Sequence, residues 1–447
     1  MECGHVRSKP VHPHANSVSP APSIREDRSM LPQRPEARRL LAGVLLSFIG
    51  RGLTLPFLFI YLTDVRGLSD ALAGIAVGWF GVVVLAGSPI SGTLIDRYGA
   101  RPVLIAGTTA QLAGSLALAF AATPLTVFAA LTVAAAGNAP AWSGNTVLLT
   151  TLTGEQERQR VFGLQFTLLN LGVAVGGLIA GAIVDVTRPA TFQLIYLLDG
   201  ATFLVPLAIL LTMPGVGGRI ARDPSPARVT GGYRTVLRDR PFRRLVLFGL
   251  VLTTCGYAQV EVGFAAFSVR VADVSPRVVS LALAANSVTI VLAQLAVVRL
   301  LQGRSRSLAL SMVGALFGLS WLVLGAGGLA GSGAPLAAAL AVIGCAVVFS
   351  LGETLLQPVM PALTNALATD ELRGRYNAVN SINFGISGII GPISAGPLIG
   401  AGHGTLWIGL LLTGCLVASL LALSLRRLLT PAQDGFASAA AQPAPAG

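Results

Sequence analysis

Four ionisable residues lie inside long apolar stretches of this sequence, where a charged group is costly. They are Arg51, Asp199, Glu261 and Glu353. A charged side chain at the centre of a bilayer costs about 2.5–3.5 kcal/mol on insertion scales, so such residues usually face one another or a water-filled cavity. A carboxylic acid in that setting can take up and release a proton, whereas an arginine can bind an anion or favour the charged form of a carboxylate.

The positions of these residues along the apolar stretches predict their depth. Arg51 lies twelve residues beyond Arg39, which is roughly 18 Å along a helix; Glu353 is also deep, and Glu261 lies nearer the opposite side. We therefore expect Arg51 and Glu353 to meet across a cavity, with Glu353 as the carboxylate that couples proton movement. The alternatives are a purely structural ion pair for these two, a solvated carboxylate for Glu261 and a bond to neighbouring helices for Asp199.

The composition indicates that the apolar stretches are membrane spans. Of the 447 residues, 53% are hydrophobic and 11% are charged, and the mean hydropathy is +0.73, whereas an ordinary soluble domain carries about 25% charged residues. This excludes a disordered chain, a disulfide-rich secreted module and an ordinary soluble enzyme. Twelve apolar segments are each long enough to cross the hydrocarbon core as a helix. They cover residues 39–63, 71–94, 101–121, 124–149, 160–186, 190–213, 244–267, 278–300, 306–329, 335–364, 376–400 and 404–425.

Polar segments divide the chain into two halves. Residues 214–243 form one long hydrophilic linker, which separates six-helix bundles at 38–213 and 244–427. The segments 1–37 and 428–447 have the composition of disordered tails. We therefore expect an all-α membrane protein with twelve transmembrane helices.

Basic residues gather on one side of the predicted spans. Of 31 in total, 26 fall on the side of the N-terminal tail and four on the other side, while Arg51 lies within a span. This asymmetry predicts that both termini are cytoplasmic and that the protein is a multi-pass protein of the cell inner (plasma) membrane. Because the charges are spread between spans, they do not form the patch typical of a nucleic-acid partner.

An internal repeat relates the two halves. With an offset of 215 residues, RQRVFGLQFTLLNLGVAVGGLIAG at 158–181 aligns with RGRYNAVNSINFGISGIIGPISAG at 373–396. Gly176 then pairs with Gly391. Parallel repeats of this kind predict two pseudo-symmetric bundles that move against each other in alternating access.

The sequence offers no residues suited to a metal or a nucleotide. The four cysteines are scattered without Cys-x-x-Cys or cysteine–histidine spacing, and the four histidines form no catalytic group. We therefore expect no metal, no cofactor and no enzymatic activity. The chain also lacks the G-x-x-x-x-G-K-[ST] loop that binds ATP, so any transport would be driven by a gradient.

The loop after the second span carries a short signature. It reads GTLIDRYGARP, and its characteristic residues are Gly92, Asp96, Arg97, Gly99 and Arg101. This loop resembles the G-x-L-x-D-R-x-G-x-R signature of the major facilitator superfamily, and with the twelve spans and the repeat the resemblance covers residues 39–427. Asp96 and Arg97 are expected to form charge-assisted pairs that gate the cytoplasmic face; a topological anchor is the alternative. The corresponding loop of the second half keeps Gly303 and Arg304 but has no acid.

Glycines in the fifth and eleventh spans form a second signature. They are Gly172, Gly176, Gly177 and Gly181 in the fifth span, and Gly391 and Gly396, with Pro392, in the eleventh. The first group resembles the G-x-x-x-G-P-x-x-G-G signature of the family's antiporter branch, although Gly177 stands at the proline position. Close helix packing through small residues is the alternative to a hinge. The fourth span lacks the arginine that is another signature of that branch.

The resemblance also implies a function. In this family spans 1, 4, 7 and 10 line the central pathway, which places Arg51, Glu261 and Glu353 on it and Asp199 on a peripheral helix. The implied protein is a monomeric multidrug exporter in the lipid bilayer, which exchanges amphiphilic small molecules for protons. An uptake symporter or facilitator for a polar metabolite is a second hypothesis, and a non-transporting membrane scaffold or sensor is a third.

Overall fold

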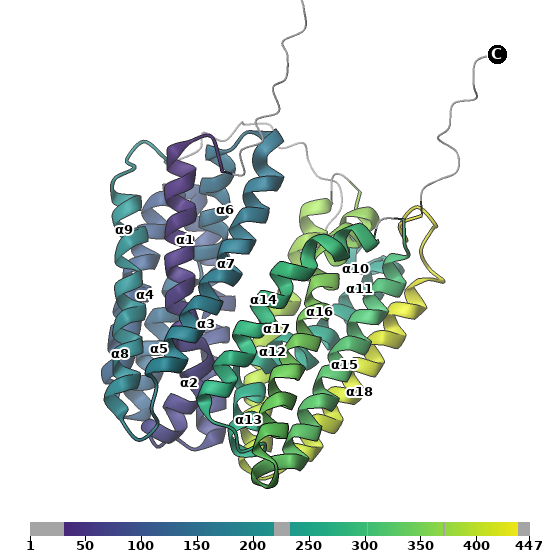
Figure 1. The fold of residues 1–447 in the computed structure, drawn as a ribbon. Coiled ribbons are helices and arrows are strands. Elements are labelled where there is room, and N and C mark those ends of the chain that lie inside the picture. Colours follow the sequence, from purple (N-terminus) through teal and green to yellow (C-terminus); the bar gives the residue numbers. More distant parts are fainter. Residues whose placement is uncertain (1–30, 219–232, 302, 370–371, 437–447) are drawn as a thin grey trace, which may run out of the picture.

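The computed structural model describes residues 31–218, 233–301, 303–369 and 372–436, which form helices and turns without any strand. Within this part of the chain, twelve helical stretches are long and apolar enough to cross a membrane. They form two bundles that stand side by side (Figure 1). The prediction of an all-helical protein with twelve spans is therefore confirmed, and the N-terminal tail expected at 1–37 lies largely outside the described residues.

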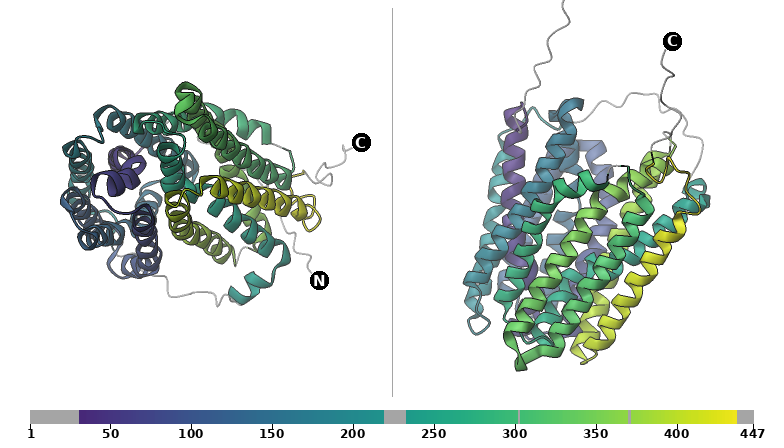
Figure 2. Two further views of the ribbon diagram at one scale, coloured as in Figure 1. Left: turned by 90° about the horizontal axis from the view of Figure 1, so that it is seen from below. Right: turned by 45° about the vertical axis from the view of Figure 1, so that its right-hand side comes forward.

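The N-terminal half contains the first six spans. The first span consists of α1 (Pro35–Thr54), η1 (Leu55–Phe57), α2 (Leu58–Ile60) and η2 (Tyr61–Val65). The next five are α3 (Asp70–Tyr98), α4 (Ala100–Phe120), α5 (Pro124–Asn138) with α6 (Ala141–Leu152), α7 (Glu155–Ile183), and α8 (Pro189–Thr202) with α9 (Leu204–Leu211). Seen along the bundle in the left panel of Figure 2, α1 lies inside a ring formed by the other helices of its half.

The C-terminal half repeats this arrangement. A short helix, α10 (Tyr233–Arg238), precedes the seventh span, which consists of α11 (Arg240–Cys255), α12 (Tyr257–Gln259), η3 (Val260–Phe264) and α13 (Ala265–Arg270). The remaining spans are α14 (Pro276–Leu301), α15 (Arg306–Ala330) with η4 (Gly331–Gly333), α16 (Pro335–Leu367), α17 (Arg373–Gly400) and α18 (Gly404–Leu425).

The first span of each half is interrupted at a corresponding point. Pro56 has no N–H to donate, so the regular bonding of α1 ends at Thr54 and a 3-10 turn and a π-helical turn follow. In the seventh span, α11 ends at Cys255 with Gly256 as its C-cap, and a π-helical turn follows at Val260–Phe264. Such irregular turns change the direction in which the following side chains point, and they are frequent at functional sites.

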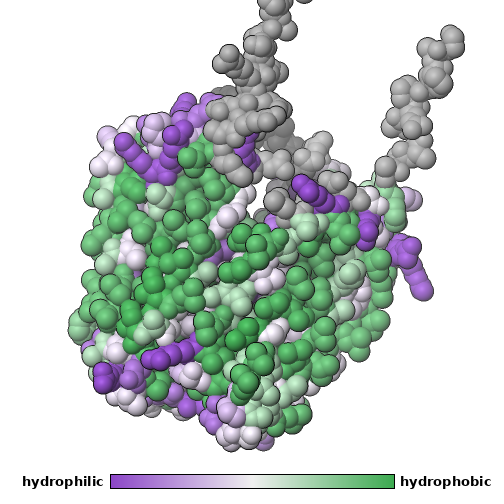
Figure 3. Space-filling view, viewed as in Figure 1, coloured by the Kyte–Doolittle hydropathy of each residue, from purple (hydrophilic) through white to green (hydrophobic). Residues whose placement is uncertain are grey.

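The two halves approach each other at one end of the molecule and separate at the other. We call the end where α1 begins and α18 ends the terminal end, and the opposite end the far end (Figure 1). Toward the far end α3 packs against α17 and α7 packs against α14. At the terminal end the space-filling view shows a gap between the halves, above a broad hydrophobic band (Figure 3).

Glycine permits the closest of these contacts. Near the start of α3, an added Cβ on Gly74 would meet Gly396 and the backbone of Pro392 on α17. On the second pair of helices, a Cβ on Gly181 would come within 2.9 Å of the Ser280 side chain on α14. Backbones that lie this close exclude larger side chains, as in other membrane helix pairs that meet through small residues.

Two described segments extend beyond the boundaries that the sequence predicts for the C-terminal half. The seventh span begins at Arg240 rather than 244, because Pro241 takes a position in the first turn, where its missing N–H costs nothing. The C-terminal tail expected from 428 is ordered through residue 436. In this segment the buried carboxylate of Asp434 accepts the backbone N–H of Ser307 at 2.8 Å and the hydroxyl of Ser305 at 2.7 Å, and so caps the start of α15.

Candidate functional site

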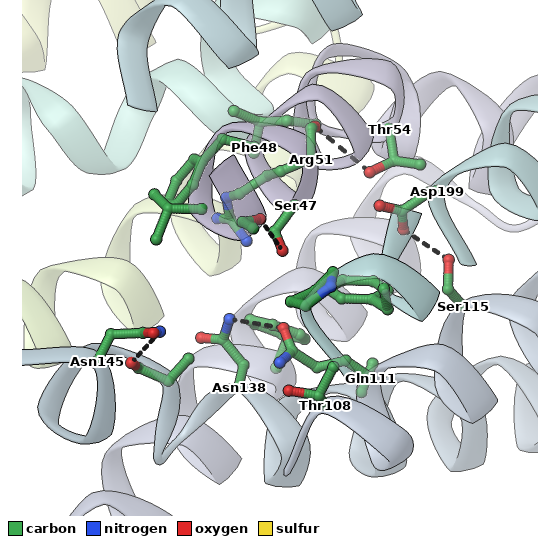
Figure 4. A pocket seen from close by; sticks show the side chains of 18 of the residues that line it. Ser47, Phe48, Arg51, Thr54, Thr108, Gln111, Ser115, Asn138, Asn145 and Asp199 are labelled. Carbon is green, nitrogen blue, oxygen red and sulfur yellow. Dashed lines mark hydrogen bonds between the residues drawn. The ribbon is translucent and has the colours of Figure 1, made fainter. Parts of the chain in front are cut away.

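A cavity of about 210 Å³ lies within the N-terminal half and reaches the interface with the C-terminal half. Its wall is formed by residues of the first span (α1, η1 and α2) and of α3, α4, α5, α6, α8 and α9, and Glu261 of η3 contributes from the other half. Much of the wall is apolar, with Phe48 and Phe80 among its aromatic members. The polar groups that line it are Ser47, Arg51, Thr54, Thr108, Gln111, Ser115, Asn138, Asn145, Tyr196, Asp199 and Glu261. Figure 4 labels all of these except Tyr196 and Glu261.

An ion pair crosses from one half to the other at this cavity. The guanidinium of Arg51 on α1 lies 3.0 Å from Oε1 of Glu261 on η3, and each side chain is 38% exposed. Both residues lie in interrupted spans. Arg51 is in the last turn of α1, just before the 3-10 turn, and Glu261 is within the π-helical turn of the seventh span. The expectation that Arg51 would meet Glu353 is wrong for this structure, in which Glu261 takes that place.

Glu353 instead lies in a separate polar cluster within the C-terminal half. Asn286 on α14 donates to its Oε2 at 2.7 Å, and the hydroxyl of Tyr257 lies nearby. Aromatic rings surround this cluster, because the ring of Tyr257 lies 5.7 Å from those of Phe349 and Phe384. Glu353 is therefore a carboxyl group held by neutral donors in apolar surroundings.

Asp199 lies at the cavity rather than on a lipid-facing surface. It is 8% exposed, and its Oδ2 is 2.6 Å from the hydroxyl of Ser115 on α4. The same hydroxyl lies 3.2 Å from the carbonyl oxygen of Tyr196. The sequence expectation of a bond to a neighbouring helix is thus met, but the side chain also lines the cavity.

The sequence analysis did not identify the polar face of α4, which is the third span. Thr108, Gln111 and Ser115 all line the cavity, and Gln111 accepts a hydrogen bond from Asn138 at 3.3 Å. We expected only spans 1, 4, 7 and 10 to line the pathway. The spacing of three and four residues places these groups on one side of a helix, and this pattern is the signal that could have identified them.

The signature loop joins α3 to α4 at the terminal end. Gly99 adopts a φ of 91°, which side chains other than hydrogen rarely allow, and so permits the tight turn. Arg101 binds the last carbonyl groups of α9: its Nε donates to Leu210 at 2.6 Å and its terminal nitrogen to Leu211 at 3.2 Å. The guanidinium of Arg97 lies 5.3 Å from the ring centre of Tyr98. The gating role expected for Asp96 and Arg97 stays a prediction.

The signature glycines lie where helices come closest. An added Cβ on Gly172 would lie 2.8 Å from the carbonyl oxygen of Leu45, and one on Gly176 would collide with that of Ile49, both on α1. Gly391 makes the equivalent approach to Ala258 on α12. These positions are accounted for by close packing of α7 on α1 and of α17 on α12, without requiring a hinge.

Comparison with known proteins is consistent with this architecture. The family model described as Major Facilitator Superfamily matches residues 40–275. The multidrug resistance protein MdtH of Photorhabdus laumondii is 26% identical over 369 residues, which are 81% of this chain and 86% of that protein. A Na⁺, Li⁺, K⁺/H⁺ antiporter of Planococcus maritimus is 23% identical over 76% of this chain and 84% of its own length.

Other comparisons are shorter or concern the fold. The MdtH protein of Aeromonas salmonicida is 26% identical over 204 residues, so the match spans only 49% of that relative's length. Among solved structures, a POT family transporter in complex with 5-aminolevulinic acid has a TM-score of 0.74 at 16% identity, covering 88% of this chain and 96% of its own. At that identity the likeness concerns the fold alone.

Proposed function

The chain belongs to the Major Facilitator Superfamily, and from this premise we propose that it exports amphiphilic small molecules in exchange for protons. Membership makes it a multi-pass membrane protein of a family of secondary transporters. The observation that carries the proposal is the set of ionisable groups within the spans: Arg51 and Glu261 bridge the two halves, while Glu353 and Asp199 are held by neutral donors. In such surroundings an unpaired charged carboxylate is high in free energy, so the group can bind and release a proton during a transport cycle.

Glu353 is the proposed coupling carboxylate. Its hydrogen bond comes from the amide of Asn286, and the hydroxyl of Tyr257 lies nearby; both are neutral groups that can serve either protonation state. The surrounding aromatic rings would favour contact with an apolar, ring-bearing solute. Substrate that enters beside Glu353 would change its surroundings and so release its proton, which is what exchange requires.

The substrate class is proposed from the wall of the main cavity and from the relatives. The wall combines apolar side chains such as Phe48, Leu55 and Phe80 with a few polar groups, and pockets of this kind bind amphiphilic ligands of modest size. The names of two relatives, a multidrug resistance protein and a cation/proton antiporter, point toward efflux or ion exchange.

The orientation belongs to the same proposal. The excess of basic residues at the terminal end favours a cytoplasmic location for that end. The gap between the halves would then open to the cytoplasm. At the far end, Arg270 on α13 forms ion pairs with Asp64 and Asp70 of the other half, so this structure would be the state that receives cytoplasmic substrate.

The first test measures proton movement in inside-out vesicles with an acidified lumen, read by a pH-sensitive dye. Candidate amphiphiles are added to vesicles with the wild type, Glu353→Gln or Asp185→Asn at matched abundance. Asp185 is a matched control because it lies in the loop before α8, outside the spans. We expect substrate-evoked proton efflux with the wild type and the control, and its loss with Glu353→Gln.

The other outcomes of this test are equally informative. Proton efflux that survives Glu353→Gln would contradict the assignment of that residue while keeping antiport. Substrate movement without any proton signal would overturn exchange and favour the second candidate, a facilitator or symporter for a polar metabolite. That candidate draws support from the amide-lined side of the cavity, where Asn138, Asn145 and Gln111 lie.

A further inference from the structure

Asp199 carries an unused acceptor in a buried place. Its Oδ2 is bonded to Ser115, but its Oδ1 has no hydrogen-bond partner among the described residues, and neither does the hydroxyl of Tyr196 one turn earlier on α8. The two residues are 8% and 2% exposed, and both line the main cavity. A buried charged carboxylate in that position would lack a counter-ion, because Arg51 is paired elsewhere.

Arg51 nevertheless lies next to Asp199. Gly50 packs so closely on α8 that an added Cβ would collide with Oδ1 of Asp199, and Arg51 is the following residue of the chain. The charge of Arg51 acts on the Asp199 carboxyl group across the cavity. One arginine therefore has two acidic neighbours, Asp199 in its own half and Glu261 in the other.

We propose that Asp199 is a proton-binding site of the N-terminal half and that its charged form competes with Glu261 for Arg51. The proposal rests on the alternating access of the proposed function, but not on Glu353 or on any particular substrate. It assigns Asp199 a role separate from that of the carboxylate in the C-terminal half.

The hydrogen bonds fit the protonated form of Asp199 in this structure. A proton on Oδ2 is donated to the Ser115 oxygen 2.6 Å away, and the Ser115 hydroxyl then donates to the Tyr196 carbonyl 3.2 Å away. The Asp199 carboxyl proton and the Ser115 hydroxyl proton then each have one acceptor. Arg51 stays with Glu261 and holds the two halves together.

When Asp199 loses its proton to water in the cavity, both the direction of the Ser115 hydrogen bond and the partner of Arg51 change. The Ser115 hydroxyl then donates to the charged carboxylate, and Arg51 turns from Glu261 to Asp199, since an unpaired buried carboxylate is the costlier alternative. The bridge between the halves is broken in that step, which frees them to separate at the far end and to close at the terminal end.

The surroundings of Asp199 contain few other groups that titrate. The groups that face it are Arg51 from α1, Ser115 from α4 and Tyr196 on its own helix; α9 carries no ionisable residue. The ionisable residues of α4 and α7 lie in the first turns of those helices, at the terminal end. Glu261 is paired with Arg51.

Electron paramagnetic resonance distances between the halves test this proposal without substrate. Spin labels are placed at the terminal end, at Thr151 on α6 and Leu300 on α14, in a cysteine-free background; both positions are exposed. In the wild type we expect the distance to shorten as the pH rises through the titration of Asp199. Asp199→Asn should lose this shift and keep the long distance at every pH, whereas Glu261→Gln should favour the short one.

The controls separate this proposal from folding effects and from the proposed function. Asp185→Asn should retain the wild-type shift, because Asp185 lies in the loop before α8, and Ser115→Ala should displace its midpoint. A wild-type shift in Asp199→Asn, or no effect of Glu261→Gln, would overturn the proposal. A normal shift in a protein that moves no protons with any amphiphile would instead contradict the export proposal alone.

Discussion

At the scale of single residues, the arginines of this protein differ in what they bind. Arg51 and Arg270 bind carboxylates of the opposite half, whereas Arg101 binds two backbone carbonyl groups at the end of α9. The planar guanidinium suits this last role, because it presents several donors in a fixed fork. Arg101 therefore joins the start of α4 to the end of α9 within one half.

This role predicts the effect of a conservative change. Arg101→Lys keeps the charge but replaces the fork by one ammonium group, which cannot reach both carbonyl groups with the same geometry. We expect a loss of about 1 kcal/mol in the free energy of unfolding, the usual net value of one hydrogen bond. Thermal unfolding of purified protein in detergent measures it.

Arg97→Lys provides the comparison, because Arg97 lies over the ring of Tyr98 in the same loop. We expect it to affect transport more than stability, as a gating residue would. Equal destabilisation by both substitutions would show that the loop acts only as an anchor.

At the scale of elements, small residues decide which helices can approach. On α7, Gly172 and Gly176 face the backbone of α1, whereas Gly163 has nothing within 4 Å of an added Cβ. The same helix thus offers a crowded glycine and an open one. The interrupted α1 and its partner α7 form the wall against which Arg51 is positioned.

The two positions on α7 predict opposite effects of alanine. Gly176→Ala drives a methyl group into the carbonyl oxygen of Ile49, and overpacking of this kind costs about 1–3 kcal/mol. Gly163→Ala adds no contact and gains up to about 1 kcal/mol in helix propensity. The apparent melting temperature should fall for the first variant and hold or rise for the second. A fall of the same size in both would contradict the packing account.

At the scale of the whole molecule, the two halves are joined at the far end by charge as well as by packing. Arg270 contacts Asp64 and Asp70 across the interface. These side chains are 37%, 23% and 19% exposed, so each pair is worth no more than about 1 kcal/mol. Such a closure is weak enough to open during a transport cycle.

Removal of the Arg270 ion pairs should shift the equilibrium from the state closed at the far end toward a state that is open there. Arg270→Ala loses both pairs, about 1–2 kcal/mol in total, which changes a population ratio roughly 5- to 30-fold. A cysteine at Ala73, buried on α3 near the far end, should then react faster with a membrane-impermeant thiol reagent. Arg188→Ala is the matched control, since its partner Asp185 lies in the same half. Similar rates in both variants would contradict a gating role for Arg270.

The sequence by itself determined the number of spans, the two-half organisation, the signature loop and the four ionisable residues within the membrane. These features depend on local properties: hydropathy over about 20 residues identifies a span, and residue spacing predicts depth along a helix axis. The glycine signature likewise marked helices that pack closely, because small residues alone allow that approach.

Only the tertiary structure decided which charges meet. Arg51 and Glu353 are predicted to lie at similar depths in the membrane. The direction in which each side chain points around its helix axis, however, depends on how the helices pack and on where they are interrupted. The π-helical turn at Val260–Phe264 shifts the phase of the seventh span, and Glu261 rather than Glu353 then faces Arg51. Asp199 reaches the cavity because α8 packs against α1 and α4, a neighbourhood that no spacing along the sequence specifies.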